Sequence, residues 1–307
     1  MKYDLIVAGC GFSGAVIAHL AAKRGDRVLL VEKRGHIAGN MYDYVDEAGI
    51  LVQKYGPHSL HTNHARVRAF LSGLWEWEPF ILRARAMIRG RATPSPFNLK
   101  TIDDYYAPDR AGQLKERLKA VYGDAKKTTI VELLESPDPV IREYAQFLFE
   151  EDYRPYTAKQ WGIAPETLDV SVLKRVPVRL DYTDAYFDDD WQVLPKKSFT
   201  AFFERLLDLP GIELRLRTNI LDHLSLDSES GTLSFDGQTA GVPVVYTGPL
   251  DELFGCCYGS LPYRSLRFEW KTLEMDSFQE TPGVAHPKAE GFTRITEYTK
   301  QPPQDGH

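Results

Sequence analysis

The chain has 307 residues, of which 43% are hydrophobic, 26% charged and 12% aromatic. A chain of this length and composition is expected to be globular, with more than one core. Its formal net charge is −6, from 37 Lys and Arg against 43 Asp and Glu, so it has no overall basic field for nucleic acid or an anionic membrane.

The three cysteines are Cys10, Cys256 and Cys257, and they show no CxxC spacing. This pattern argues against a disulfide framework and against a zinc site, and it favours a reducing compartment. No segment reaches the ~20 apolar residues that span a bilayer, and the amino terminus leads into a strand-like run and not into a cleavable signal. We therefore expect a cytoplasmic protein without a membrane span, a metal site or a nucleic-acid partner.

The chain begins with the order strand, glycine turn, helix and strand. Residues 3–8 form a short apolar run typical of a buried parallel strand. Residues 15–23 have a helical pattern, and residues 27–31 form the next strand. This order predicts a parallel βαβ unit at the amino terminus.

Three glycines occupy the turn between the first strand and the helix. Gly9 permits the tight turn, Gly11 lets the backbone approach a pyrophosphate, and Gly14 lets the helix pack closely on the strand. Glu32 ends the second strand, where an acidic side chain accepts hydrogen bonds from a ribose 2′-hydroxyl and disfavours NADP. These features predict a Rossmann-like site for FAD or NAD. Its candidate cofactor-binding residues are Gly9, Gly11, Phe12, Ser13, Gly14 and Glu32.

The segment after Glu32 reads KRGHIAGNMYDY. In flavoproteins of the glutathione-reductase kind, a basic residue and a glycine-rich turn at this point approach the FAD diphosphate from the other side. Lys33, Gly39 and Asn40 resemble that arrangement, which favours FAD over NAD. An ordinary connecting loop is the alternative.

The rest of the chain alternates between helical and strand-like patterns. Apolar residues at spacings of three and four predict helices at 111–123 and 140–153. Alternating and aromatic-rich pieces at 80–91, 172–191 and 263–271 suit an antiparallel sheet, and 242–246 is a buried strand. We expect an α/β protein with a discontinuous nucleotide domain (1–72 and 198–250), a small helical domain (101–170), an antiparallel sheet substrate domain (73–100, 171–197 and 251–298) and a loose tail (299–307).

A series of motifs makes a more specific resemblance. They are YGPHSLHTN (55–63), PFNL (96–99), PYTAKQWG (155–162), LKRVPVRLDYTDAYF (173–187), VYTGPLDELF (245–254), YRSLRFE (263–269) and FTRITEY (292–298). In this order, and beside the FAD-type amino terminus, they resemble the UDP-galactopyranose mutase family from residue 3 to about residue 298. The resemblance implies an FAD-dependent enzyme that interconverts UDP-galactopyranose and UDP-galactofuranose.

In that family the flavin must be reduced, and its N5 is thought to attack the anomeric carbon while UDP leaves. The cofactor carries the bond-making step, so no side-chain nucleophile is needed. The protein has to hold a diphosphate, stack a uracil and place a sugar, tasks that suit arginines, aromatic rings and amides. The resemblance also allows a homodimer.

The resemblance assigns roles to particular residues. The catalytic candidates are Arg175 and Arg294, which grip the substrate diphosphate, and His61, which lies near the flavin with His58. The substrate-binding candidates are Tyr153, Tyr156, Trp161, Tyr186 and Asn98. Each has an alternative: a surface charge for Arg175, core packing for the aromatic residues, a structural role or a metal for the two histidines, and a turn for Asn98.

The chain departs from the family pattern at several points. Ala38 stands where family members commonly have glycine, and Lys196 to Ser198 replace a glycine-containing turn. Ala285 or His286 stands where an asparagine helps to position the sugar. The family continues past the position of His307 with a further strand, flavin-binding and diphosphate-binding residues and a closing helix, and none of those residues can be assigned here.

Two alternative functions remain open. An FAD oxidoreductase of the amine-oxidase type shares the fold but consumes its substrate by hydride transfer. A truncated, non-catalytic remnant of the mutase would bind nucleotide weakly or not at all.

Overall fold

The computed structural model describes residues 2–162, 176–227 and 230–304. Two compact units make up the chain, each assembled from two segments. Unit 1 comprises Met1–Phe80 and Val193–Thr272, and unit 2 comprises Ile81–Gln192 and Leu273–His307. Within the described residues, no helix is long and apolar enough to cross a membrane.

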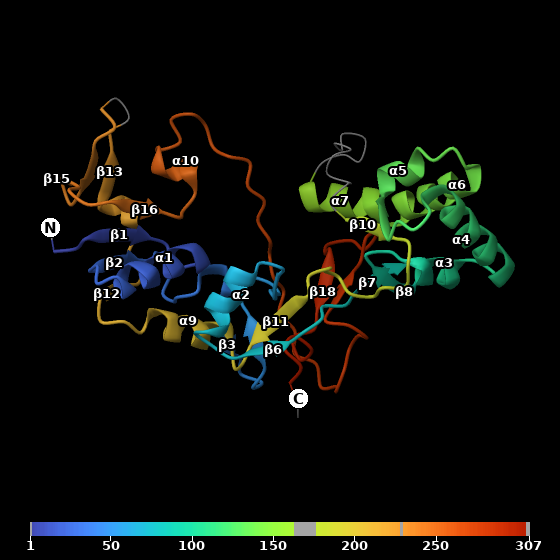
Figure 1. The fold of residues 1–307 in the computed structure, drawn as a ribbon, viewed down its shortest axis with the longest axis horizontal. Coiled ribbons are helices and arrows are strands. Elements are labelled where there is room, and N and C mark those ends of the chain that lie inside the picture. The colour runs from blue at the N-terminus through green and yellow to red at the C-terminus, as the bar shows by residue number, and fades with distance from the viewer. Residues whose placement is uncertain (1, 163–175, 228–229, 305–307) are drawn as a thin grey trace. The chain divides into compact units, whose positions relative to one another are not determined.

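The main sheet of unit 1 has four parallel strands in the order β12–β2–β1–β16 (Figure 1). These are β12 (Ile212–Arg215), β2 (Val28–Val31), β1 (Leu5–Ala8) and β16 (Val244–Tyr246). Every residue of β1 and β2 is buried, which explains why both strands are unbroken apolar runs in the sequence. The expected strands at 3–8, 27–31 and 242–246 are confirmed.

Helix α1 (Phe12–Lys23) follows β1 directly and packs beside α9 (Phe199–Leu207). The Phe12 ring lies 4.9 Å from Phe203 and 5.8 Å from Phe202, centroid to centroid. The amphipathic segment at 199–207 is therefore a helix whose aromatic face covers the first turn of α1. This contact anchors the end of α1 that follows the glycine turn.

The amino terminus of α9 is held by a carboxylate from another part of unit 1. Asp43 is buried, and its two oxygens accept hydrogen bonds from the backbone nitrogens of Phe199 (2.7 Å) and Thr200 (2.8 Å). Ser198, the N-cap residue, accepts from Ala201 N. Burial raises the pKa of Asp43, and the hydrogen bonds from this helix end oppose the rise.

Smaller elements complete unit 1. They are the β3–β4 hairpin (Asp43–Val45 and Leu51–Gln53), the three-stranded sheet β5–β11–β6 (Leu60–Thr62, Trp191–Pro195 and Trp77–Pro79), the three-stranded sheet β13–β14–β15 (Leu224–Leu226, Leu233–Phe235 and Gln238–Thr239), the helices α2 (Ala65–Ser72) and α10 (Leu250–Leu253), and the 3₁₀ turns η1 (Gly39–Met41) and η4 (Ile220–Asp222).

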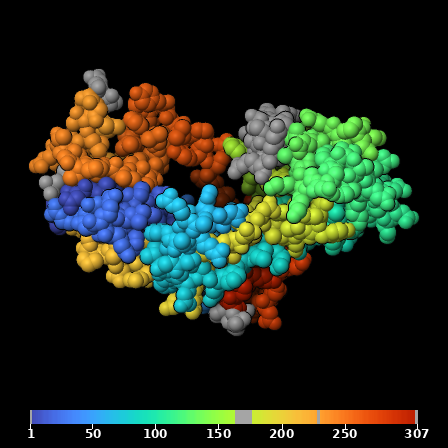
Figure 2. Space-filling model, in the orientation of Figure 1, coloured from blue at the N-terminus to red at the C-terminus, as the bar shows by residue number. Residues whose placement is uncertain are grey.

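The segment after α10 differs from the sequence expectation. Residues 263–271 form no strand, and the segment lies on the molecular surface, coloured orange in Figure 2. Tyr263 is 58% exposed and Leu266 is 60% exposed. The prediction of a strand here was wrong because alternation and β-branched or aromatic content favour a strand only where a neighbouring strand supplies the hydrogen bonds.

The helices of unit 2 carry most of its core. They are α3 (Leu99–Tyr105), α4 (Pro108–Tyr122), α5 (Ile130–Leu134), α6 (Pro139–Leu148), the π-helical turn η2 (Phe149–Tyr153) and α7 (Arg154–Trp161). The predicted helices at 111–123 and 140–153 are confirmed, the second with a change to π-helical geometry in its last five residues. Their apolar stripes meet in one cluster that includes Leu114, Ile141 and Tyr144.

A four-stranded sheet lies in the same unit, in the order β18–β17–β7–β8. Its strands are β18 (Arg294–Thr296), β17 (Gly283–Ala285), β7 (Ala84–Ile88) and β8 (Arg91–Ser95), and a separate ladder joins β9 (Lys127–Thr129) to β10 (Pro177–Arg179). The pairs β17–β18 and β7–β8 are antiparallel, but β17 and β7 are parallel. The sheet is therefore mixed and not wholly antiparallel, because β17 and β7 come from segments far apart in the chain.

Candidate functional site

The glycine turn of unit 1 has the close packing that its sequence predicts. A Cβ atom on Gly14 would lie 1.9 Å from the carbonyl oxygen of Gly9, so the helix contacts the turn at a distance that only glycine permits. Gly9 has a φ of +98°, and its Cβ would lie 2.2 Å from Oγ1 of Thr247. That hydroxyl donates to the carbonyl of Ala8 (2.7 Å), which ties the turn to the end of β16.

Gly11 has the opposite surroundings. No heavy atom lies within 4 Å of the position that its Cβ would take. Gly11 is the N-cap residue of α1, and no side chain caps that helix end. The space at the Gly11 Cβ position, together with first-turn N–H groups that have no partner within the helix, is what an anion-binding helix end requires.

Glu32 lies just past β2 and is 6% exposed. Its Oε2 accepts from the backbone nitrogen of Cys10 (2.9 Å) and its Oε1 from that of Arg34 (2.8 Å). These bonds orient the carboxylate beside the glycine turn, and each oxygen keeps a lone pair for a further donor such as a ribose hydroxyl. Burial raises the pKa of Cys10 to about 12, so this residue stays a thiol and is no nucleophile.

The loop after Glu32 is ordered by its own contacts. The backbone of Gly39 approaches Gly11 so closely that a Cβ on Gly39 would lie 2.8 Å from Gly11 Cα. Asn40 accepts a hydrogen bond from the Arg34 guanidinium (3.0 Å), and Lys33 is exposed, with Nζ 3.7 Å from Glu252. The predicted partners Gly39 and Asn40 therefore belong to the same corner of unit 1 as the glycine turn.

Ala38 adopts a backbone conformation that suits glycine. Its φ is +71°, and the residue is fully buried. A non-glycine residue in this left-handed region carries a strain of about 1 kcal/mol. Alanine in place of the family's glycine at position 38 therefore lowers the stability of the folded protein locally, while the turn keeps its left-handed geometry.

The two histidines of the GPHSLHT motif lie in different settings. Nδ1 of His58 is 2.8 Å from the carbonyl oxygen of Gly56, and its backbone nitrogen donates to Gln53 Oε1. His61 lies in β5 and is partly buried. His58 is therefore held by its own turn, which supports a structural contribution for that ring.

Unit 2 brings several predicted substrate residues together. Tyr156 lies in α7, and its pKa is raised by burial, with the nearby Arg294 guanidinium opposing the rise and Asp152 and Tyr186 adding to it. Asp152 and Tyr186 also add to a rise that burial causes in the pKa of Tyr153. Tyr153, Tyr156, Tyr186 and Arg294 thus lie within electrostatic range of one another or of Asp152, and we term them the tyrosine–arginine cluster.

Arg294 is the exposed cation of the tyrosine–arginine cluster. It opens β18 and lies on the surface. Among the described residues, no carboxylate forms an ion pair with its guanidinium. A solvent-accessible guanidinium is suited to a phosphate ligand, because its planar fork binds two oxygens at once.

Tyr153 and Asn98 serve the core of unit 2. Tyr153 is 4% exposed, its hydroxyl donates to Val176 O (3.1 Å), and its ring lies 5.8 Å from Phe97. Asn98 is 1% exposed and caps α3: its Oδ1 accepts from Lys100 N (2.8 Å) and its Nδ2 donates to Thr183 O (3.0 Å). Both side chains are hydrogen-bonded within the protein. These contacts agree with the alternatives of core packing for Tyr153 and a turn residue for Asn98.

Trp161 ends α7 and is partly buried. Tyr186 is also partly buried, and its ring lies 4.9 Å from that of Phe187 in an edge-to-face arrangement. Arg175, the other predicted diphosphate ligand, lies outside the described residues.

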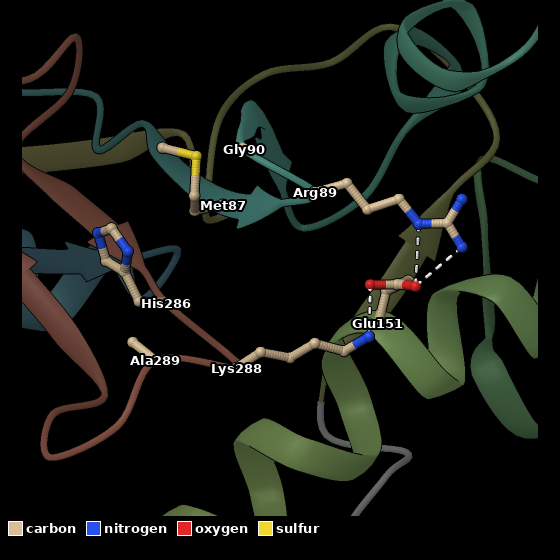
Figure 3. Close-up of a pocket in the computed structure, with 7 residues that line it drawn as sticks. All are labelled: Met87, Arg89, Gly90, Glu151, His286, Lys288 and Ala289. Atoms are coloured by element: carbon tan, nitrogen blue, oxygen red, sulfur yellow. Dashed lines mark hydrogen bonds and ion pairs between the residues drawn. The ribbon is translucent and has the colours of Figure 1, made fainter.

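Unit 2 has a pocket of about 400 Å³ at the turn between β17 and β18 (Figure 3). Glu151 accepts from Arg89 Nε (3.0 Å) and Nη2 (2.9 Å) and from Lys288 Nζ (2.6 Å). The pocket is also lined by Met87, Gly90, His286 and Ala289. Glu151 therefore neutralises only one of the two cations, and these three side chains together carry one positive charge.

Asp152 and Thr247 are not among the site residues predicted from the sequence. Asp152 is partly buried in η2, and burial raises its pKa to about 7. Its position directly before Tyr153 in the FEEDY segment was the available signal. Thr247 follows β16 in the TGP motif, and only the contact with Gly9 reveals its function in the turn.

A parallel sheet with a glycine turn before its first helix and an acidic residue after its second strand defines a dinucleotide-binding protein of the Rossmann-like class. The family model described as an NAD(P)-binding Rossmann-like domain matches residues 7–74. The model described as UDP-galactopyranose mutase matches residues 152–307. The chain belongs to the UDP-galactopyranose mutase family of enzymes.

Curated relatives are similar along almost the whole chain. The UDP-galactopyranose mutase of Mycoplasma pneumoniae is 36% identical over 99% of this chain and 76% of its own length. A probable UDP-galactopyranose mutase of Klebsiella pneumoniae is 33% identical over 99% of this chain and 75% of its own. A dTDP-fucopyranose mutase of Escherichia coli is 32% identical over 99% of this chain and 78% of its own.

Solved structures share the fold. A reduced UDP-galactopyranose mutase aligns with a TM-score of 0.58 at 17% identity, over 83% of this chain and 57% of that chain. A putative protoporphyrinogen oxidase from Exiguobacterium aligns with a TM-score of 0.55 at 15% identity, over 98% of this chain and 74% of that chain. At these identities the likeness concerns fold alone.

Proposed function

We propose that this protein binds FAD and interconverts UDP-galactopyranose and UDP-galactofuranose. The observation that carries the proposal is the exposed Arg294 guanidinium, within electrostatic range of Tyr156 and with no carboxylate partner among the described residues. An anionic ligand would complete this arrangement, and the diphosphate of a UDP-sugar has the required charge and shape. The mutases named among the curated relatives act on sugars of this kind.

The glycine turn of unit 1 fits the proposed cofactor. The Cβ position of Gly11 at the amino terminus of α1 faces open space, and Glu32 keeps acceptor capacity beside it. The FAD pyrophosphate would lie against the backbone N–H groups of the first turn of α1, and a ribose hydroxyl would donate to Glu32. When bound and reduced, FAD supplies the nucleophile for the anomeric carbon.

The side chains of unit 2 have the complementary task. Arg294 and, by resemblance, Arg175 bind the diphosphate and stabilise the negative charge that develops as UDP departs. Tyr156, Trp161 and Tyr186 line the nucleotide and diphosphate channel. Tyr153 and Asn98 support these residues from the core, through the hydrogen bonds to Val176 and Thr183.

The direct test is turnover of UDP-galactofuranose under anaerobic conditions with dithionite-reduced protein. We expect UDP-galactopyranose as the product and UDP as a competitive inhibitor. A yellow protein whose flavin bleaches with dithionite but which neither binds UDP nor forms the pyranose would refute the proposal. A colourless protein that does not take up FAD would support the non-catalytic remnant.

The sugar and the reaction class are separate questions. The relative named dTDP-fucopyranose mutase makes dTDP-fucopyranose the second substrate to compare. An FAD oxidoreductase of the amine-oxidase type, which shares the fold, is the alternative reaction class. Oxygen consumption with an amine, without mutase turnover, would favour that oxidoreductase. Light scattering of the holoprotein tests the homodimer.

A further inference from the structure

Lys159 makes two contacts that link α7 to a turn far away in the sequence. Its Nζ donates to the carbonyl oxygen of His286 (2.7 Å) and to that of Ala289 (2.8 Å). Both acceptors belong to the turn between β17 and β18. Among the described residues, no carboxylate pairs with this ammonium group, so its charge is directed at the two backbone carbonyls.

The environment makes these contacts stronger than surface hydrogen bonds. Lys159 is partly buried, and burial lowers its pKa. Hydrogen bonds from a charged donor are stronger than neutral ones, and partial removal of water strengthens them further. A neutral side chain of similar length would leave the two carbonyls without this donor.

The turn that Lys159 holds leads directly to Arg294. The backbone nitrogen of His286 donates to Thr293 O (2.8 Å), which closes the hairpin, and Arg294 follows as the first residue of β18. The strand register places Ala285 opposite Arg294. Fixing the carbonyl of His286 therefore fixes the backbone from which the Arg294 side chain extends.

Helix α7, which carries Lys159, also carries Tyr156. Tyr156 precedes Lys159 by three positions on α7, so their side chains lie on neighbouring parts of one helical face. Tyr156 is within electrostatic range of Arg294, while Lys159 contacts the hairpin turn. One helical face thus contacts the start of the segment 286–294 through Lys159 and lies within electrostatic range of its end through Tyr156.

We propose that Lys159 is a positioning residue that holds Arg294 beside Tyr156, in the orientation that binds the diphosphate of the nucleotide sugar. The inference rests on the proposed function, because it takes a UDP-sugar as the ligand of Arg294. Lys159 itself does not touch the ligand; it acts through the backbone of the turn. It is distinct from Lys288, an exposed residue that extends from the same turn to the buried Glu151.

The test is a double-mutant cycle on UDP affinity in the FAD-loaded protein. We expect Lys159→Met to raise the Kd for UDP by about tenfold to thirtyfold, the range for losing hydrogen bonds from a charged group. In an Arg294→Met background the same change is expected to alter Kd by less than about twofold, because Lys159 acts through that arginine. An equal loss in both backgrounds would show a general structural effect and overturn the inference.

Lys288→Met is the matched control, because Lys288 extends from the same turn but is 55% exposed and shares Glu151 with Arg89. We expect it to change Kd by less than about threefold, because Arg89 still pairs with Glu151 when Lys288 is removed. A Lys159→Met protein with wild-type affinity, or with the same loss as Lys288→Met, would count against the proposal. If Lys159→Met does not fold, Lys159→Leu, which also lacks a donor, takes its place in the cycle.

Amide hydrogen exchange separates this inference from the proposed function. Exchange of the His286 N–H, which reports on hairpin closure, should rise about tenfold or more in Lys159→Met without any ligand present. An unchanged exchange rate of the His286 N–H in Lys159→Met would show that Lys159 does not stabilise the turn, and would overturn the inference. If the wild type fails to bind UDP while exchange still rises, the turn contact stands and both the proposed function and the positioning role fall.

Discussion

Gly14 and the carbonyl oxygen of Gly9 are so close that a methyl group on Gly14 would lie 1.9 Å from that oxygen. The neighbour is backbone and cannot rotate away. Gly11, three positions earlier, has no atom within 4 Å of its missing Cβ. The steric demand on Gly14 is therefore absent at Gly11, where the proposed cofactor would approach the backbone.

Gly14→Ala is expected to destabilise the apoprotein by about 3 kcal/mol, since overpacking against fixed backbone displaces α1 from β1. Gly11→Ala should leave the thermal unfolding midpoint of the apoprotein unchanged and reduce the bound flavin, measured as visible absorbance per protein. If Gly11→Ala bound FAD as the wild type does, the cofactor position proposed for the helix end would be wrong.

Ala38→Gly is expected to stabilise the protein by about 1 kcal/mol, because it removes the strain of a left-handed alanine. Urea unfolding of the two proteins measures the change. Ala18→Gly, in the interior of α1, serves as the control and should destabilise by about 1 kcal/mol. A loss of stability in Ala38→Gly would contradict the strain that we assign to this turn.

Asp152 predicts a pH dependence of stability. Its pKa is about 7 in the folded protein against an ordinary value of 3.8, so the folded state binds a proton that the unfolded state has released. The stability that this proton contributes is complete below about pH 4 and is lost as the pH rises towards 7. Asp152→Asn abolishes that loss.

We therefore expect the advantage of Asp152→Asn over wild type to grow by about 2 kcal/mol between about pH 5 and pH 8. Thermal unfolding midpoints at both pH values measure it. Asp124 pairs with Lys119, which lowers its pKa, so Asp124→Asn should show no such growth. The same pH profile for wild type and Asp152→Asn would show that this carboxyl titrates normally.

Tyr153 and Tyr156 are expected to respond differently to truncation. Tyr153→Ala should cost about 3–5 kcal/mol, because the ring is 4% exposed and packs on Phe97. Tyr153→Phe should cost about 1 kcal/mol, through the bond to Val176.

Tyr156→Ala should cost less stability than Tyr153→Ala, since this ring is only partly buried, and should weaken UDP binding about tenfold. Calorimetric unfolding and UDP titration of both variants separate the two functions. A larger loss of UDP affinity in Tyr153→Phe than in Tyr156→Ala would instead place Tyr153 on the nucleotide, the alternative left open by the sequence.

Much of unit 1 follows from the sequence because its signals are local. The strands of the βαβ unit are buried on both faces and so are apolar throughout, and the turn between them requires glycine for steric reasons that act over a few residues. The helices at 108–122 and 139–148 likewise show their apolar stripes directly. The stretch 263–271 has strand-like composition but no partner strand, so there the local pattern misled.

The sequence by itself determined the dinucleotide-binding turn, the helical segments and the family, because these depend on spacing along the chain. Only the tertiary structure decided which candidate side chains are free to meet a ligand. The sequence motif predicts a ligand-binding amide at Asn98, but its Nδ2 donates to the carbonyl oxygen of Thr183, 85 positions away. Lys159 gains its function from carbonyls 127 and 130 positions further on. Such contacts leave no periodic trace, since they join segments that only folding brings together.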